Sequence, residues 1–315
     1  MNEVKNAENE VIENIAINDL VDDFINSLDV KESSRKTYRT NIKPFIKWLM
    51  DTGLIDRLNT ISREDILNYK KELMKKDLSV YSINSYITAV RSFFKWLESK
   101  KIYPNIASDI KGLKKPKGYK KDCLTVEQVR QALDSIDTDT LTGKRNYALF
   151  NLIARTGLRT IEVKRAKEGD IKQESGKPVL YIQGKGRDSK DNFVLLTDES
   201  LKPIRSYLAA REQEGEKITE DSFLFTSHNY NKASEGLTRR SIRRVIKRIL
   251  KGIGLNTKRY SAHSLRHTAI TLAIQGGASL EQAQAMARHS DPKTTMIYFH
   301  NLNRIENAAE KKINF

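Results

Sequence analysis

Hydrophobic positions in the first third of the chain recur with the spacing of amphipathic helices. Within residues 17–28 the apolar side chains lie three and four positions apart: Leu20, Val21, Phe24, Ile25 and Leu28. A helix with this spacing buries one stripe against its neighbours. Related patterns occupy residues 33–53, 62–76 and 80–101, and the first of these opens on serine. Four helices with short connections predict a small helical bundle.

The remaining two thirds of the chain alternate between helical and strand patterns. Helical spacing is found in four further segments: residues 124–136, 144–157, 201–212 and 237–251. Residues 179–183 and 192–196 are short β-branched runs separated by the turn-rich GKGRDSKD. They predict a β-hairpin with a long tip. Residues 222–225, SFLF, are a candidate third strand.

Pairs of residues typical of helix N-termini mark where several helices begin. In a capping box, a Ser or Thr side chain and a residue three positions later satisfy each other's backbone N–H groups. Three pairs fit this spacing: Ser62 with Asp65, Thr125 with Gln128, and Ser279 with Gln282. Further on, Asp291 and Pro292 are typical of an N-cap and a first helical residue. Tyr298 is thereby predicted on the second turn of a helix that begins just after His289.

Residues 237–251 form the most regular amphipathic pattern. The apolar positions follow the helical period: Ile242, Val245, Ile246, Ile249 and Leu250. Seven arginines and lysines, and no acid, occupy other positions of this segment. The pattern predicts a helix with one core face and one cationic face. A membrane-surface helix is the weaker interpretation, because the apolar edge lacks Trp and Phe.

Together these patterns predict two domains. Residues 17–110 form an all-α four-helix bundle, and residues 124–301 form a mainly helical α+β domain with a small antiparallel sheet. An acidic segment, residues 1–16, precedes the bundle. Residues 111–123 read as a basic linker because residues 111–121 hold six lysines, two glycines, one proline and no acid. This linker either crosses a phosphate backbone or is a solvated hinge.

The distribution of charge along the chain indicates the kind of partner. The net charge of +16 is unevenly distributed, with −7 in residues 1–30, +13 in residues 31–121 and +10 in the remainder. Such a field attracts a polyanion over a long surface, although a merely soluble basic protein remains the alternative.

Other compositional features exclude whole classes of site. The single cysteine, Cys123, excludes an intrachain disulfide and any multi-cysteine metal site. No HExxH motif is present and no apolar run approaches the roughly 18 residues of a membrane span. The acidic N-terminus lacks the regions of a secretory signal. We expect a cytoplasmic protein without metal, cofactor or membrane partner.

Candidate catalytic side chains stand at helix starts and turns. Arg159 follows a helix ended by Gly157, where a guanidinium suits the recognition of phosphate. His263 and Arg266 lie three apart and share a helical face. His267 lies with the apolar run that follows, and we interpret it as a core histidine. Lys185 stands between two glycines at the hairpin tip, where it can approach a partner or simply be solvated.

In combination these motifs resemble the tyrosine recombinases, the phage-integrase and Xer-like family. The matching stretches are TGLR, GKG, HSLRH and RHSDPKTTMIY, within a resemblance over residues 17–305. It implies that residues 17–110 are a core DNA-binding domain and residues 124–301 a catalytic domain. One departure is Arg288, where the family more often has glycine. We expect this to change local packing and leave the role of His289 intact.

The resemblance implies a role for each residue. Tyr298 attacks a DNA phosphodiester and forms a 3′-phosphotyrosyl link, which stores the bond energy without ATP or a metal. Arg159 and Arg266 stabilise the charge that develops on phosphate, and His289 hydrogen-bonds it. His263 is the implied base, and Lys185 protonates the leaving 5′ oxygen. Glu162, three residues after Arg159, faces the same way and orients the catalytic groups without contacting the substrate.

Double-stranded DNA with an inverted-repeat core site is the expected partner. Candidate DNA contacts are Lys36, Arg39, Asn84, Ser85, Arg91, Lys115, Arg239, Arg240, Arg243 and Arg244. We expect a monomer or weak dimer off DNA and a homotetramer on synapsed DNA, with a nucleoid-associated location. By resemblance, residues 302–315 dock on a neighbouring subunit, or else pack back in cis.

The function predicted is site-specific recombination, for integration and excision of a mobile element or for resolution of replicon dimers. The short acidic segment before residue 17 gives no expectation of a separate arm-site-binding domain. Two other classes stay open. A type IB topoisomerase uses the same chemistry to relax DNA, and a DNA-binding protein without catalysis would share the basic surface.

Overall fold

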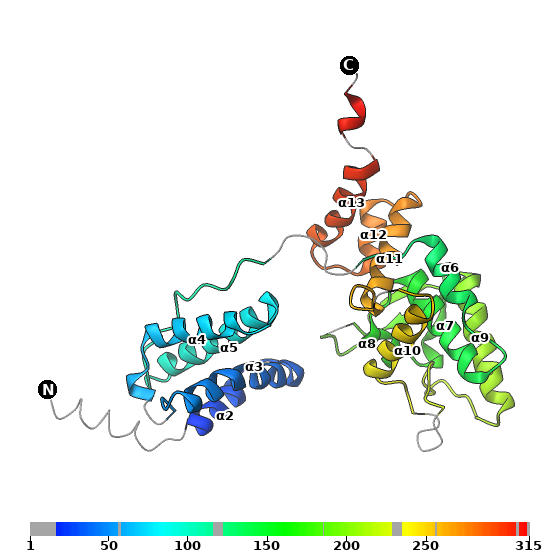
Figure 1. Cartoon of the computed structure of the whole chain (residues 1–315). Coiled ribbons are helices and arrows are strands. Elements are labelled where there is room, and N and C mark those ends of the chain that lie inside the picture. The colour runs from blue at the N-terminus through cyan, green and yellow to red at the C-terminus, as the bar shows by residue number, and fades with distance from the viewer. Residues whose placement is uncertain are drawn as a thin grey trace, which may run out of the picture. The chain divides into compact units, whose positions relative to one another are not determined.

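The computed structural model describes residues 17–55, 58–115, 122–184, 186–228, 235–255, 257–306 and 309–313 (Figure 1). For residues 58, 301–306, 309 and 312 it describes the backbone alone. The chain divides into two compact units, Met1–Gly118 and Tyr119–Phe315. Within the described ranges, none of the helices has the length and apolar character that a membrane crossing demands.

The first unit is the predicted helical bundle. Its elements are α2 (Ile17–Ser27), α3 (Glu32–Asp51), a 3-10 turn (Leu58–Thr60), α4 (Arg63–Lys75) and α5 (Val80–Ser99) (Figure 1). The stripe predicted on the first helix is buried, with Phe24 inaccessible to solvent. Phe24 packs edge-on against Phe93, and Phe45 packs edge-on against Tyr69. Aromatic side chains from different helices therefore interlock at the centre of this unit.

The starts of α3 and α4 differ in how they are capped. Ser62 and Asp65 form the predicted capping box at α4. Helix α3 instead begins at Glu32, and its N-cap, Lys31, makes no side-chain cap. The serine pair predicted at the start thus lies inside the first turn. The Arg35 guanidinium secures this end by donating to the Leu28 carbonyl oxygen at 3.0 and 3.1 Å.

The segment that follows the bundle is tied to α5. The Asn84 side-chain amide donates to the Leu113 carbonyl oxygen at 2.9 Å and accepts from the Leu113 backbone N–H at 2.6 Å. Gly112 passes so close that a Cβ there would meet Asn84 Oδ1 at 2.8 Å. Lys70 donates to the Lys111 carbonyl oxygen. The side chains of Asn84 and Lys70 therefore hold the backbone of residues 111–113 against α4 and α5.

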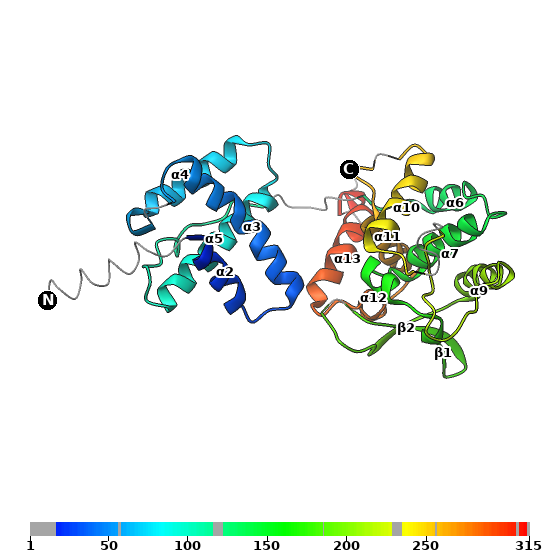
Figure 2. The same cartoon turned by 90° about the horizontal axis from the view of Figure 1, so that it is seen from below.

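The second unit combines helices with one small sheet. Its helices are α6 (Val126–Asp134), α7 (Leu141–Thr156), α8 (Thr160–Arg165), α9 (Asp198–Gln213), α10 (Arg239–Gly252), α11 (Ala262–Gln275), α12 (Leu280–Ala287) and α13 (Pro292–Glu306), with 3-10 turns at Glu168–Asp170 and Ala309–Lys312 (Figure 2). Helix α7 is buried along most of its length and contacts α6, α9, α10 and α11. The two-domain, mainly helical fold class is confirmed.

The sheet confirms the hairpin and corrects the third strand. Strands β1 (Ile171–Glu174), β2 (Lys177–Ile182) and β3 (Asn192–Leu195) pair antiparallel in the order β1-β2-β3. Sequence patterning missed β1 because its middle residues are exposed and polar. It forms through a tight turn in which Ser175 and Gly176 both have positive φ, the twist that a hairpin favours.

Residues 222–225 are not a strand, contrary to the prediction from SFLF. Phe223 makes only an isolated bridge to Lys167. Two buried guanidinium groups take carbonyl oxygens in and beside this segment. Arg211 donates to the Phe223 oxygen at 2.8 Å and Arg145 to the Thr226 oxygen at 3.1 Å. The backbone of this region pairs with two separate segments, since Leu224 donates to the Ala166 carbonyl and Leu237 donates to the Phe225 carbonyl, so each pairing is a single bridge and no ladder forms.

Helix α10 has the predicted two faces. Ile242, Ile246 and Leu250 are buried, while Arg240 and Arg244 are exposed. The Thr238 side chain accepts from the Ser241 backbone N–H and caps the start. The apolar face belongs to the main core of the second unit, so the cationic face is turned outward.

Candidate active site

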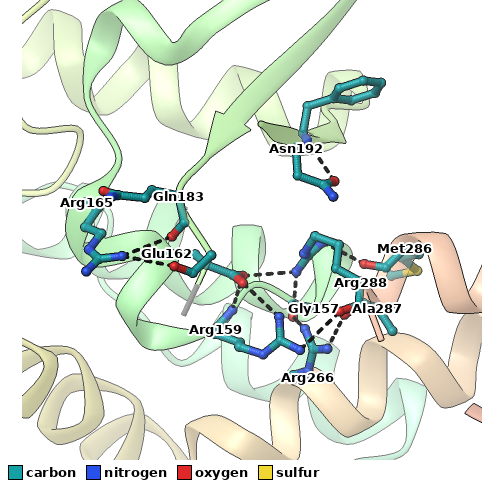
Figure 3. A network of polar contacts seen from close by, with 12 residues as sticks. Gly157, Arg159, Glu162, Arg165, Gln183, Asn192, Arg266, Met286, Ala287 and Arg288 are labelled. Carbon is teal, nitrogen blue, oxygen red and sulfur yellow. Dashed lines mark hydrogen bonds and ion pairs between the residues drawn. The ribbon is translucent and has the colours of Figure 1, made fainter. Parts of the chain in front are cut away.

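Three junctions of the second unit bring the candidate side chains together. These are the turn from α7 into α8, the first turns of α11, and the turn from α12 into α13. Figure 3 shows Arg159 and Arg288 at Glu162, and Arg266 and Arg288 at the carbonyl of Gly157. The three guanidinium groups come from segments more than 100 residues apart in places.

The α7–α8 turn depends on a glycine. Gly157 ends α7 with φ of 62°, the left-handed conformation that glycine adopts readily. A Cβ there would contact the Ala269 methyl at 3.5 Å, so α11 also packs closely. Arg159 is then the N-cap of α8, and Glu162 accepts from its backbone N–H at 2.7 Å and its Nη1 at 2.9 Å. Glu162 is fully buried, as its predicted supporting position requires.

Arg266 is held by backbone carbonyls on both sides. Its Nη1 donates to Gly157 at 2.6 Å and its Nη2 donates to Ala287. Only 2% of the residue is exposed. Burial, followed by the positive charges of Arg159 and Arg288, lowers the pKa of Arg266 to about 9, so it remains protonated at pH 7.

Arg288 is an unexpected member of the cluster. It ends α12 in the left-handed conformation, with φ of 54°, and its side chain is only 6% exposed. Its Nη2 donates to Glu162 Oε2 at 3.1 Å and to the Gly157 carbonyl at 3.3 Å. Its Nη1 donates to the Met286 carbonyl at 2.6 Å. Burial is the largest cause that lowers the pKa of Arg288.

His289 is oriented by the helix that carries Tyr298. Its Nδ1 is hydrogen-bonded to Thr295 Oγ1 at 2.9 Å, and Thr295 is completely buried. Asp291 caps α13 by accepting from the Lys293 backbone N–H, as predicted. Burial and then the charges of Arg266, Arg159 and Arg288 lower the pKa of His289 to about 4. The imidazole is therefore neutral at pH 7.

Tyr298 lies in a small apolar cluster with Ile270 and Ala287 and is 5% exposed. Its hydroxyl is hydrogen-bonded to Nδ1 of His267. Burial, then the charges of His263 and Arg266, lower the pKa of His267 to about 4. A neutral imidazole in one tautomer accepts from a phenol. His267 is buried as the sequence predicted, yet it contacts the candidate nucleophile directly.

The ring of His263 packs against the ring of His267. The centroids of His263 and His267 are 4.3 Å apart with the rings edge to face. His263 keeps an exposed edge, but packing around its ring and the charges of Arg266 and Arg159 hold its pKa below the ordinary value. It is thus a neutral imidazole at the surface of the site.

Lys185 lies outside the described residues. Gly184 before it accepts from the Arg165 guanidinium at 3.1 Å. Gly184 lines an open cleft of about 730 Å³ together with Arg159, Arg288 and His289.

A second hollow of about 290 Å³ adjoins Arg159. Arg266 and His263 line it, and so do two arginines of the cationic face of α10, Arg239 and Arg243. The candidate catalytic groups are therefore continuous with that face, in a pocket that an anion can enter.

Comparisons with known proteins decide the family. The profile of the phage integrase family matches residues 122–304, and that of the phage integrase N-terminal SAM-like domain matches residues 21–101. The tyrosine recombinase XerD of Listeria monocytogenes serotype 4b is 30% identical over 90% of this chain and 94% of its own length.

The chain belongs to the phage integrase family, the tyrosine recombinases.

Solved structures agree on the fold. XerH bound to palindromic difH substrate superimposes with a TM-score of 0.72 at 24% identity, over 88% of this chain and 79% of that one. A lambda integrase dimer bound to a core site gives 0.68 at 16% identity, over 89% and 97%. The protein is thus a site-specific recombinase by family, with the fold of these enzymes.

The candidate DNA contacts of the recombinase differ in how free their side chains are. Lys36 is 76% exposed and 3.9 Å from the Glu32 carboxylate, whereas Arg39 forms a close ion pair with Asp22. Both polar groups of Asn84 are engaged with Leu113, and Ser85 donates to the Tyr81 carbonyl. Arg91 lines a polar hollow with Lys95 on α5. Lys115 is exposed, as are Arg239, Arg240, Arg243 and Arg244.

Three residues of the recombinase site were missed or undervalued by sequence reasoning. His267 was assigned to the core, Thr295 was not singled out, and Arg288 was treated as a change in packing. The HSLRH spacing carried a signal for His267, because His263 and His267 are four apart and share a helical face. Nothing in the local pattern joins Arg288 to Glu162.

Proposed function

We propose that this recombinase cleaves and rejoins duplex DNA with Tyr298 as the nucleophile and Arg159, Arg266 and His289 around the reacting phosphate. What supports the proposal is the proximity of the tyrosine to a cluster of three guanidinium groups beside an open cleft. Membership of the family supports the class of reaction, and this geometry supports the roles proposed for the individual residues.

The proposed step is a transesterification. The Tyr298 oxygen forms a bond to phosphorus while the bond from phosphorus to the 5′ oxygen breaks, and the product is a 3′-phosphotyrosyl link. A phenol with a pKa near ~10 is mostly protonated at pH 7, so its proton must be removed. The leaving oxygen must gain one, and Lys185 is proposed as its donor.

His267 contacts the phenol and the ring of His263 packs against that of His267, and we assign the two imidazoles different roles. His263 is the proposed base. His267 positions the hydroxyl, which is supported by their hydrogen bond. The pKa of both imidazoles is lowered, so both are in the neutral form at pH 7 that a base requires, and the burial that lowers the pKa also weakens them as bases.

The guanidinium groups would stabilise the additional negative charge on phosphorus. One preorganised donor in such a position contributes about 3–4 kcal/mol to lowering the barrier. Arg266 meets the requirement for preorganisation because two backbone carbonyls hold it in place.

We further propose that duplex DNA with inverted repeats binds across both units and that four protomers assemble on synapsed DNA. Exposed cations on α3 and α10 would contact phosphates, and affinity would then fall steeply with salt, with a log–log slope of about −0.9 per phosphate contact. Lys36, Lys115, Arg240 and Arg244 are the best placed for this, because their side chains are exposed. Asn84 would read bases only after releasing Leu113.

A nicked suicide substrate carrying the cognate site tests the proposal. The wild-type protein should form a covalent complex that survives denaturation, and Tyr298→Phe should form none while binding the same DNA. Absence of adduct from the wild type would favour a DNA-binding protein without catalysis. Efficient relaxation of random-sequence plasmid by monomers would favour a topoisomerase.

The C-terminal tail is proposed to act in trans. The 3-10 turn of this tail ends at Lys312, and Ile313 after it is 60% exposed. Truncation after Asn301 should reduce cooperative assembly on DNA more than binding to a single half-site. Equal assembly by the truncated protein in gel-shift titrations would contradict this.

The biological role is tested outside the protein. Inverted repeats of about 11 bp at the end of an element flanking the gene would favour integration and excision. Resolution of replicon dimers predicts a site on the host chromosome instead.

A further inference from the structure

The backbone at residue 288 adopts a conformation that does not suit an arginine. Its φ of 54° and ψ of 46° place it in the left-handed region at the end of α12. Glycine occupies this region without steric cost, whereas a side chain with Cβ is strained there. A residue retained against such strain is expected to contribute something through its side chain.

The side chain of Arg288 is used almost entirely inside the protein. Its two terminal nitrogens donate to Met286, Gly157 and Glu162. Its Nε is buried and has no partner within the described part of the chain. With both terminal nitrogens engaged, this guanidinium is arranged to hold its neighbours.

The acceptors of Arg288 are also those that anchor the two proposed catalytic arginines. Glu162 binds the backbone N–H and Nη1 of Arg159, and the Gly157 carbonyl binds Nη1 of Arg266. Arg288 Nη2 lies between these acceptors, at 3.1 Å from one and 3.3 Å from the other. A single nitrogen thus joins the anchor of Arg159 to the anchor of Arg266 (Figure 3).

Charge gives Arg288 a second effect. Glu162 is the carboxylate shared by Arg159 and Arg288, while Arg266 binds neutral carbonyls. The cluster formed by Arg159, Arg266, Arg288 and Glu162 therefore has a net formal charge of two positive. With glycine at 288 it would have one, and Glu162 would neutralise Arg159 more completely. Excess positive charge suits a phosphate that becomes more negative during attack.

We propose that Arg288 is a positioning residue for strand cleavage, which joins the anchors of Arg159 and Arg266 through Glu162 and Gly157 and leaves the cluster with surplus positive charge. The inference rests on the proposed function, because it concerns the same reaction. It assigns Arg288 an action through other residues and no contact with the scissile phosphate.

The test compares single-turnover formation of the covalent adduct on the nicked substrate with noncovalent DNA affinity. Arg288→Gly relieves the strained backbone, which offsets part of the loss of the side-chain hydrogen bonds, so the protein should fold with at most a small change in Tm. Its cleavage rate constant should fall about 10- to 100-fold, the effect of a small misplacement of reacting groups. The Kd for DNA should change less than about threefold, a small part of an affinity dominated by many phosphate contacts.

Two further variants separate positioning from packing. Arg288→Lys keeps the charge and one donor, so it should recover part of the rate that Arg288→Gly loses. In a Glu162→Gln background the anchor is already weakened, and adding Arg288→Gly should then cost less than about threefold. A purely structural role predicts neither the rescue nor this non-additivity.

Ser175→Gly is the matched control. Ser175 also has positive φ, at 49°, but it is an exposed, uncharged residue in the β1–β2 turn. This change relieves the same kind of backbone strain and should leave cleavage unchanged.

If the wild type forms the adduct and Arg288→Gly cleaves at the same rate, the inference is overturned and the proposed function stays intact. Failure of the wild type itself to form adduct would overturn the proposed function instead. Equal rates for Arg288→Lys and Arg288→Gly would also count against a role for the charge.

Discussion

Two arginine sites lie in the second unit, one a single buried guanidinium and the other a cluster of three, and they differ in how their charge is balanced. Arg211 on α9 is 1% exposed and binds Glu216 through Nε at 2.8 Å and through Nη2, while Nη1 donates to the Phe223 carbonyl. This single guanidinium therefore binds one carboxylate, and each of its three nitrogens donates a hydrogen bond. The cluster of Arg159, Arg266 and Arg288 has three guanidinium groups and one carboxylate, Glu162, which only Arg159 and Arg288 contact.

The difference separates what a buried arginine does for the fold from what it does for a reaction. A fork that matches a carboxylate bidentately is satisfied within the protein, so it offers nothing to a ligand. Like charges gathered around one carboxylate repel each other, and the lowered pKa of Arg266 reports that repulsion together with burial. Such a cluster is stabilised when an anion enters.

The largest expected effect is on cleavage. Arg266→Met should lower the rate constant of adduct formation by about 1,000-fold, because a preorganised donor to the reacting phosphate is lost. The free energy of unfolding should fall less than in Arg211→Met, because the removal of one of three mutually repelling charges offsets part of the loss of the donors to Gly157 and Ala287. Quench assays on the nicked substrate and urea denaturation measure the two. A large loss of stability would place Arg266 with Arg211.

The corresponding change at Arg211 should show the opposite division. Arg211→Met leaves Glu216 and the Phe223 carbonyl without their donor and should lower the free energy of unfolding by about 3 kcal/mol. Cleavage per folded molecule should be unchanged. The double variant Arg211→Met with Glu216→Gln should recover part of the stability in urea titrations. A loss of cleavage at full stability would contradict the comparison.

A fall in pH should lower the stability of the protein through one histidine near each arginine site. The pKa of His267 beside Tyr298 and that of His228 beside Arg145 and Arg211 are each lowered to about 4, mainly by burial. The unfolded chain, with a histidine pKa near ~6.5, binds more protons than the folded one between these values. Stability is therefore complete above about pH 6.5 and falls as the pH drops towards 4.

For His267, which is 8% exposed, this loss is on the order of 3 kcal/mol. His228 is more exposed and should contribute less. The free energy of unfolding, measured with urea from pH 4 to 7, should depend less steeply on pH in His267→Gln. The difference should correspond to the uptake of about one proton on unfolding. An unchanged slope in that variant would mean that His267 is not neutral in the folded protein.

The smallest expected effect is anion binding without DNA. Inorganic phosphate at tenfold its Kd should stabilise the wild type and Arg211→Met by about 1.4 kcal/mol, and Arg266→Met by much less. The pKa of His289, followed by NMR, should rise when phosphate binds, because the anion offsets the charges that lower it. That of His228 should not move. Equal responses of the two histidines would indicate nonspecific binding.

Much of the helical framework could be predicted because its signals are local. The capping boxes at Ser62, Thr125 and Ser279 are satisfied as expected, and each depends on residues three positions apart. The periodic face of α10 is buried, and Pro292 begins α13. Within a helix, spacing also placed His263 and Arg266 on one face.

Predictions failed where distant segments compete for the same backbone or side-chain groups. Residues 222–225 have strand composition, yet the backbone there and beside them is divided between two separate segments, 166–168 and 235–237, each of which makes a single bridge. Conversely β1 has little strand character and forms because β2 lies across a tight turn. Neither outcome can be read from the segment alone.

The sequence by itself determined the helices, the hairpin, the basic charge and, through its motifs, the family to which the chain belongs. Only the tertiary structure decided that Tyr298 contacts His267 and that Arg288 joins Glu162 to Gly157. The physical reason is distance along the chain. Caps and periodicity act within one or two turns, whereas Glu162 and Arg288 are 126 residues apart and meet only after α11 has packed against α7 and α12 against α11.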